Sequence, residues 1–167
     1  SYYIPDRMEE GYGFSLQSTE NVLKINPDLV VTVDCGITAK EYIQELTNRG
    51  ITVIVTDHHE IMPDQIPECF SVLAVSHPDS GYPFRYLCGA GVVFKLITAM
   101  CMALGERNEF SFTKIDGNIK DRYLDYLDLA ALGTVADVVS LTGENRIIVK
   151  YGLEKISKTE RTGLREL

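Results

Sequence analysis

The stretch Ile51-Thr52-Val53-Ile54-Val55-Thr56-Asp57-His58-His59 decides how this chain is expected to fold. Its first six residues are mostly β-branched, carry no charge and follow a glycine, which predicts a buried parallel strand. An acid and two imidazoles come directly after it, where open α/β sheets bind ligands beyond the carboxyl ends of their strands. Imidazole and carboxylate together suit a divalent transition metal. The alternative interpretation is a solvated loop after a strand.

A second strand of the same kind comes earlier in the chain. Residues 29–33 form a short apolar run that ends in Asp34-Cys35-Gly36. Residues 39–49 lie between the two runs and have apolar side chains at helical spacing, which predicts a helix. A strand, helix and strand of this length form a right-handed unit with parallel strands whose ends lie side by side. We therefore expect Asp34 at the same sheet edge as Asp57, His58 and His59.

A third acid interrupts an apolar stretch further along. Asp137 lies within residues 129–139, which are otherwise uncharged and mostly apolar, so the pattern predicts that it is at least partly buried. A buried carboxylate needs a partner or a metal. Taken alone, such an acid is more often a helix cap or a paired core acid. With Asp34 and the histidines within reach, a metal ligand becomes the favoured interpretation.

The remaining pattern predicts an α/β fold: a mainly parallel sheet of about five strands with helices on both faces. The segment Gly89-Ala90-Gly91 opens a long apolar helix, and the free N–H groups of a glycine-rich helix start can bind an anion. Close packing of this helix against the sheet is an equally good interpretation of these residues. Further elements are expected as a strand at 1–5, a helix at 15–25, a strand at 72–75, helices at 89–104, 119–132 and 145–158, and a polar loop at 105–118.

Composition agrees with one globular domain. The chain has 167 residues, of which 45% are hydrophobic, and its 24 acids against 16 bases give a net charge of −8. This balance is unlike that of a free-standing nucleic-acid binder. Four cysteines without a C-x-x-C pair indicate neither a zinc site nor a redox motif, and they suit a reducing cytoplasm. Neither a signal peptide nor an apolar run long enough to span a membrane is visible.

Five segments together carry a resemblance to a known family. Asp34-Cys35-Gly36, Asp57-His58-His59 and Gly133-Thr134-Val135-Ala136-Asp137 resemble the ordered motifs of the DHH phosphoesterase superfamily. Residues 5–13 (Pro-Asp-Arg-Met-Glu-Glu-Gly-Tyr-Gly) and 82–96 are similar to its RecJ branch, the bacterial 5′→3′ exonucleases specific for single-stranded DNA. The resemblance implies an enzyme: a metal-dependent phosphodiesterase of DNA repair and recombination.

The resemblance also implies roles for individual residues. Asp34 would bridge two metal ions, and His58 and Asp137 would be further ligands of one of them. His59 would face the scissile phosphate, while Asp57 would orient its neighbours without binding a metal directly. Arg7 stands at a basic position of the branch motif and is a candidate phosphate clamp, because its planar guanidinium binds phosphate bidentately. A surface ion pair of Arg7 with Glu9 or Glu10 is an equally good interpretation.

The implied cofactor is Mn²⁺, with Mg²⁺ possible, because imidazole suits Mn²⁺ better than Mg²⁺. Two ions would be present in the parent protein and would activate water and neutralise charge. One departure matters: the superfamily begins with a strand carrying Asp-x-Asp, and no such segment is found in these residues. We therefore expect an amino-terminally truncated DHH domain at 1–158 that holds at most one ion weakly and is inactive alone.

Several expectations concern what surrounds this domain. Residues 159–167 are expected to start an interdomain connection, and carboxyl-terminal domains of the parent would supply affinity for single-stranded DNA. His77 occupies a position where the branch commonly has Asn, so it is interpreted as a loop histidine near the site, with a replacement ligand as the alternative. Whether His77 or Asp79 substitutes for missing ligands stays open at this point.

Two other function classes remain. One is a DHH relative that hydrolyses cyclic dinucleotides or short oligonucleotides, against which residues 7–13 and 82–96 argue. The other is a non-catalytic DHH-fold assembly module, against which the retention of Asp34, His58 and Asp137 argues. Polarity of digestion, processivity, oligomeric state and protein partners do not follow from the residues.

Overall fold

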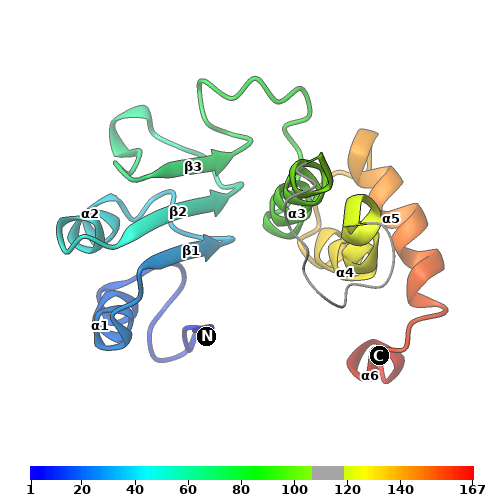
Figure 1. Ribbon diagram of the computed structural model, residues 1–167, viewed down its shortest axis with the longest axis horizontal. Helices are drawn as coiled ribbons and strands as arrows, with labels where there is room; N and C mark the ends of the chain where they lie inside the picture. The colour runs from blue at the N-terminus through cyan, green and yellow to red at the C-terminus, as the bar shows by residue number, and fades with distance from the viewer. Residues whose placement is uncertain (107–118) are drawn as a thin grey trace. The chain divides into compact units, whose positions relative to one another are not determined.

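A parallel three-stranded sheet organises the first half of the chain in the computed structural model, which describes residues 1–106 and 119–167 (Figure 1). Most of the polar loop expected at 105–118 falls outside these residues. The described chain divides into two compact units, Ser1–Arg85 and Tyr86–Leu167. The sheet lies in the first unit, and the second unit is helical.

The strands of the first unit run in the order β1 (Leu29–Val33), β2 (Thr52–Asp57) and β3 (Ser71–Ala74). Both pairs are parallel, with Leu29 opposite Thr52 and Ile54 opposite Ser71. Helix α2 (Lys40–Asn48) connects β1 to β2. The predicted strand–helix–strand unit is therefore confirmed, and the α/β class with a parallel sheet is confirmed with it. The described residues contain three strands where about five were expected.

The core of this unit lies between the sheet and two helices. Helix α1 (Leu16–Ile25) begins at the cap Ser15, whose side chain accepts a hydrogen bond from the N–H of Ser18. It packs with α2, and α2 contacts β2. Both helices and the strands contribute to the buried cluster, because apolar side chains recur at helical spacing in α2 and alternate along β2. The cluster comprises Val22, Ile37, Ala39, Ile43, Leu46, Ile51, Val53, Val55 and Ala74.

The expected strand at residues 1–5 is not formed. Strand β1 pairs with β2 alone, and residues 1–5 lie across a hollow of about 560 Å³ from β1. Leu29, Val31 and Val33, which alternate along the strand, are 44–53% exposed. A β-rich sequence needs a paired neighbour to become a strand, and residues 1–5 have none among the residues described.

The second unit consists of helices around a small apolar core. Helix α3 spans Gly89–Glu106, and α4 (Leu127–Ala136) packs against both α3 and α5 (Gly143–Ile156). The segment expected as one helix from 119 divides into the 3₁₀ turns of η2 (Ile119–Tyr126) and then α4. Two short elements complete the description: η1 (Pro63–Gln65) in the first unit and α6 (Thr162–Arg165) in the second.

A buried carboxylate ties the last residues of the chain to this unit. The side chain of Asp128 is 1% exposed and accepts hydrogen bonds from Arg161 Nε at 3.0 Å and Thr159 Oγ1 at 3.2 Å. Arg161 also donates to the backbone carbonyl of Asp125 at 2.9 Å. Because hydrogen bonds to a charged group are stronger than neutral ones, these contacts fix the start of the segment 159–167 on the first turn of α4.

Replacing Gly152 by alanine is expected to destabilise the second unit. A Cβ at Gly152 would lie 2.2 Å from Cβ of Ala131 and 2.6 Å from the carbonyl oxygen of Leu127, so α4 and α5 would have to move apart. Overpacking of this kind costs typically about 1–3 kcal/mol. Urea unfolding followed by tyrosine fluorescence measures the effect. Gly163→Ala is the matched control, because nothing lies within 4 Å of its Cβ position; equal stability of the two variants would contradict the packing argument.

No helix in the described ranges is long and apolar enough to cross a membrane.

Candidate metal centre

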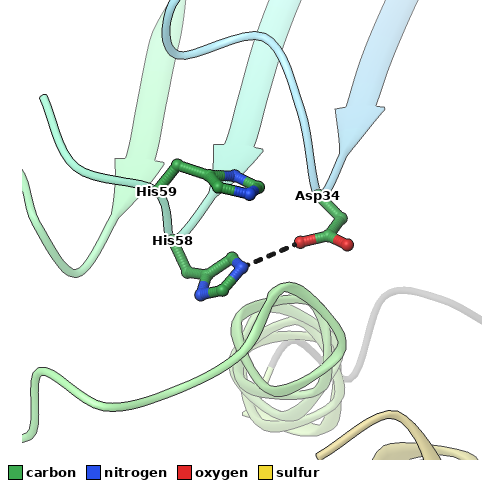
Figure 2. Close-up of side chains that lie close together, drawn as sticks. All are labelled: Asp34, His58 and His59. Atoms are coloured by element: carbon green, nitrogen blue, oxygen red, sulfur yellow. Dashed lines mark ion pairs between the residues drawn. The ribbon is translucent and has the colours of Figure 1, made fainter. Parts of the chain in front are cut away.

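The carboxyl end of β1 places Asp34 in an unusual backbone conformation. Its φ of 61° lies in the left-handed region, which Asp tolerates better than most residues, and its N–H donates to the carbonyl of Thr56 on β2. Gly36 follows with a φ of 106°, and a Cβ there would lie 2.8 Å from Oγ1 of Thr32. That hydroxyl donates to the carbonyl of Cys35 at 2.7 Å. The turn is thus fixed by local hydrogen bonds and aims the Asp34 side chain beyond the sheet edge (Figure 2).

The carboxylate of Asp57 is enclosed by hydrogen bonds from its own sheet edge. It is 1% exposed, and its Oδ2 accepts from the N–H of Ile37 at 3.0 Å. Its Oδ1 accepts from the N–H groups of His58 and His59 at 2.7 and 3.2 Å and from Nδ1 of His59 at 2.6 Å. Both oxygens are therefore used within the protein, which favours an orienting role for Asp57 over direct binding of a metal.

The two histidines after β2 lie beside Asp34. Figure 2 shows the imidazole of His58 directed at the Asp34 carboxylate, with His58 Nε2 and Asp34 Oδ1 3.2 Å apart. The rings of His58 and His59 are 4.5 Å apart between centroids. One ligand atom from each of Asp34, His58 and His59 lies within 4.8 Å of the others, and this is the only such group of acids, histidines and cysteines in the described ranges.

The donor set fits a divalent cation. Oδ1 of Asp34 is buried and lies 3.2 Å from Nε2 of His58 without meeting the geometry of a hydrogen bond, so a cation held by both atoms would give this oxygen a partner. Burial, together with the carboxylates of Asp57 and Asp34, raises the pKa of the Cys35 thiol to about 11. Cys35 therefore remains a neutral thiol at neutral pH, and carboxylate and imidazole are the ligands that the site offers.

Arg7 lies in the segment before α1 and stacks on a tyrosine. Its Cζ is 5.4 Å from the centroid of the Tyr12 ring, and the hydroxyl of Tyr12 is 3.0 Å from Nε2 of His59. Glu10, one of the two expected ion-pair partners of Arg7, instead accepts hydrogen bonds from Tyr3 and from the N–H of Asp6. The stacking of Arg7 on Tyr12 is compatible with the interpretation of Arg7 as a phosphate clamp. Tyr12 is a contact that the sequence analysis missed.

Asp137 belongs to the second unit, where it caps the carboxyl end of α4 through a hydrogen bond from its N–H to the carbonyl of Gly133 at 3.0 Å. It is exposed, so the expectation of burial is wrong: the apolar stretch is the last part of a helix, and the acid comes at the point where that helix ends. Val138 follows with a φ of 58°, a left-handed conformation that is strained for a β-branched residue. Such strain is often found at functional sites.

Comparison with known proteins identifies the family. A family model described as "DHH family, N-terminal domain" matches residues 1–134. The chain belongs to the DHH family. Its fold class and the order of its motifs agree with that assignment.

Three relatives of this DHH chain are named single-stranded-DNA-specific exonuclease RecJ. It is 40% identical over 166 residues to the single-stranded-DNA-specific exonuclease RecJ of Bacillus subtilis (strain 168), covering 99% of this chain and 19% of the relative. It is 40% identical to RecJ of Thermus thermophilus (99% and 22%) and 36% identical to RecJ of Escherichia coli (99% and 28%). The chain thus spans between about a fifth and somewhat over a quarter of these curated relatives.

Two solved structures resemble the DHH chain. A crystal structure of exonuclease RecJ bound to manganese matches with a TM-score of 0.73 and 40% identity, covering 98% of this chain and 37% of that one. RecJ in complex with Mn²⁺ from Thermus thermophilus matches with a TM-score of 0.66 and 39% identity, covering 89% and 20%. Both neighbours are manganese complexes, and the triad of this chain is a possible metal site.

The glycine-rich segment of the DHH chain does start a helix, as predicted, at Gly89. Gly91 is buried; its N–H donates to Sγ of Cys88 at 3.3 Å, and a Cβ there would meet Leu87 at 3.2 Å. A Cβ at Gly133 would lie 2.5 Å from Cβ of Ala90, so α3 and α4 approach closely here. These contacts favour close packing, in this case of two helices, over the anion-site interpretation of Gly89, Ala90 and Gly91.

His77 lies in the loop after β3. Its Nδ1 accepts a hydrogen bond from the N–H of Asp79 at 3.1 Å, and neither residue belongs to the group of ligand atoms around Asp34. The geometry agrees with the expected loop histidine. Substitution of a missing metal ligand by His77 or Asp79 finds no support in the described ranges.

Proposed function

We propose that this chain is part of a metal-dependent exonuclease that hydrolyses phosphodiester bonds of single-stranded DNA in DNA repair and recombination. The observation that carries the proposal is the group of Asp34, His58 and His59, whose ligand atoms lie within 4.8 Å at the carboxyl ends of two parallel strands. The names of the relatives and the manganese complexes among the solved structures support it. Action on cellular DNA implies a cytoplasmic protein.

The roles proposed for the residues follow from their contacts. Asp34 and His58 would hold a metal ion, because the buried Asp34 oxygen and the His58 nitrogen face each other across 3.2 Å. Asp137 is proposed as a further ligand, on the strength of the motif and of the strained Val138 beside it. When bound, Mn²⁺, or Mg²⁺ in its place, would make a water molecule acidic enough to react at neutral pH and would neutralise charge on the phosphate.

The other site residues would act on the substrate. Asp57 fixes the main chain of His58 and His59 and, through Nδ1, the orientation of the His59 ring. We propose that His59 contacts the scissile phosphate and that Arg7 binds phosphate oxygens with its guanidinium. We also propose that residues 1–158 form one DHH domain, and that 159–167 begin a connection to further domains that bind single-stranded DNA.

The substrate class is tested with the longer protein that contains this chain. With Mn²⁺ present, it should digest a 5′-phosphorylated single-stranded oligonucleotide and leave the matching blunt duplex largely intact. A cyclic dinucleotide is included as the competing substrate. Ready hydrolysis of the cyclic dinucleotide with single-stranded DNA ignored would overturn the exonuclease proposal in favour of a small-substrate phosphodiesterase. Tight metal binding without hydrolysis of either substrate would favour an assembly module.

Metal binding by the 167-residue chain itself should be weak, with at most one Mn²⁺ bound, because the described ranges offer a single group of candidate ligand atoms. His58→Ala should weaken it further, since it removes the nitrogen that faces Asp34. Calorimetric titration with Mn²⁺ measures both. His77→Ala is the matched control and should leave binding unchanged. Two tightly bound equivalents, or an equal loss in the His77 variant, would mean that other residues complete the site.

A further inference from the structure

Both ring nitrogens of His59 are already engaged by the protein. Nδ1 lies 2.6 Å from Oδ1 of Asp57, and Nε2 lies 3.0 Å from the hydroxyl of Tyr12. The Asp57 oxygen also receives the N–H groups of His58 and His59, so it acts as an acceptor and Nδ1 carries the proton that is donated to it. In the neutral ring, Nε2 then has a lone pair, and the hydroxyl of Tyr12 donates to it.

The backbone around Tyr12 is shaped to present this side chain. Gly11 and Gly13 have φ values of 80° and 88°, which side chains other than glycine rarely tolerate. A Cβ at either position would meet nothing within 4 Å, so the glycines are required by backbone conformation and not by lack of space. Tyr12 thus lies in a bend between two left-handed glycines, is 65% exposed, and has its hydroxyl 3.0 Å from Nε2 of His59.

The same side chain holds Arg7. The guanidinium carbon of Arg7 is 5.4 Å from the centroid of the Tyr12 ring, within the range of a cation–π contact. The segment is anchored to the rest of the first unit, because Tyr3 contacts Glu10 and receives a hydrogen bond from Asn21 of α1 at 3.0 Å. Tyr12 therefore connects one side chain proposed to bind phosphate, Arg7, with another, His59.

We propose that Tyr12 is a positioning residue: before the substrate binds, its hydroxyl holds the His59 ring by Nε2, and a phosphate group of the substrate then takes the place of that hydroxyl while the Tyr12 ring keeps Arg7 in order. The proposal rests on the proposed function for the identity of the ligand, a phosphate ester. Nε2 of His58 faces Asp34 at 3.2 Å and would bind the metal. The two adjacent histidines would thereby have different tasks.

The contact is tested first in the 167-residue chain without metal or substrate, by ¹⁵N NMR of the histidine rings. Tyr12→Phe removes the hydroxyl and keeps the ring over Arg7. We expect the Nε2 resonance of His59 to move downfield, as for a nitrogen whose lone pair loses its hydrogen bond, while the His77 resonances stay in place. Tyr2→Phe is the matched control, because Tyr2 is 88% exposed in the same segment. An unchanged His59 resonance in Tyr12→Phe would overturn the proposal.

The second measurement uses the longer protein and 5′-phosphorylated single-stranded DNA. Tyr12→Phe should raise KM or lower kcat/KM by roughly three- to tenfold, the effect of one hydrogen bond. Tyr12→Leu should lose more, because it also removes the ring from Arg7, and Tyr2→Phe should match the wild type. A shifted His59 resonance with wild-type kinetics in both Tyr12 variants would overturn the positioning role. If the longer protein degrades no DNA, the proposed function fails, while the NMR result still decides whether Tyr12 holds His59.

Discussion

Replacing Asp57 by alanine is expected to destabilise the first unit by on the order of 3 kcal/mol, because each buried donor left without an acceptor costs about 1–3 kcal/mol. The carboxylate is buried and accepts hydrogen bonds from the main-chain N–H groups of Ile37, His58 and His59. The turn after β1 and the turn after β2 would lose their common anchor. Urea unfolding, followed by tyrosine fluorescence, measures the loss.

The same variant should lose metal affinity, although Asp57 is not proposed as a ligand. Removing a residue that orients metal ligands typically lowers the metal affinity by roughly 10- to 100-fold. Asp57 orients both histidines. Asp57→Asn keeps the shape but turns one acceptor into a donor, so it should resemble the alanine variant. Asp64→Ala, at an exposed acid in the same unit, is the control and should change neither property. An Asp57→Ala protein of normal stability would show that the hydrogen-bond network contributes little.

Much of the sheet was predictable because its signals are local. Runs of β-branched residues at 29–33 and 51–56 and helical spacing between them were enough to place two parallel strands side by side. The convergence of Asp34, His58 and His59 then follows from topology alone, and the structure brings them together. The strand expected at 1–5 failed for the opposite reason, because strand formation depends on a neighbour that a local pattern does not reveal.

The other differences also come from context. Asp137 was expected to be at least partly buried because apolar residues surround it in the sequence, but they form a helix that ends at the acid. Tyr12 was passed over because its partner, His59, lies 47 positions away. A signal did exist in the sequence, because two glycines flanking one aromatic residue indicate an unusual backbone conformation at that residue. Both glycines do have positive φ values. Contacts between distant segments are where a sequence alone is least informative.

The largest functional effect is expected for Asp34→Asn in the longer protein. Asn tolerates the left-handed conformation of residue 34 as well as Asp does, so the turn and its hydrogen bond to Thr56 should persist. What disappears is the charge that faces His58 at 3.2 Å. Losing a ligand of the proposed metal site would remove several kcal/mol of transition-state stabilisation, and each ~1.36 kcal/mol is tenfold in rate.

We therefore expect digestion of 5′-phosphorylated single-stranded DNA to fall by about three orders of magnitude or more in Asp34→Asn. Asp28→Asn, an exposed acid just before β1, is the matched control and should retain wild-type activity. Unfolding curves of the two variants should coincide, because the Asp34 side chain is 46% exposed and receives no hydrogen bond on Oδ1 within the described ranges. A stable Asp34→Asn enzyme with near-normal activity would remove Asp34 from the proposed metal site.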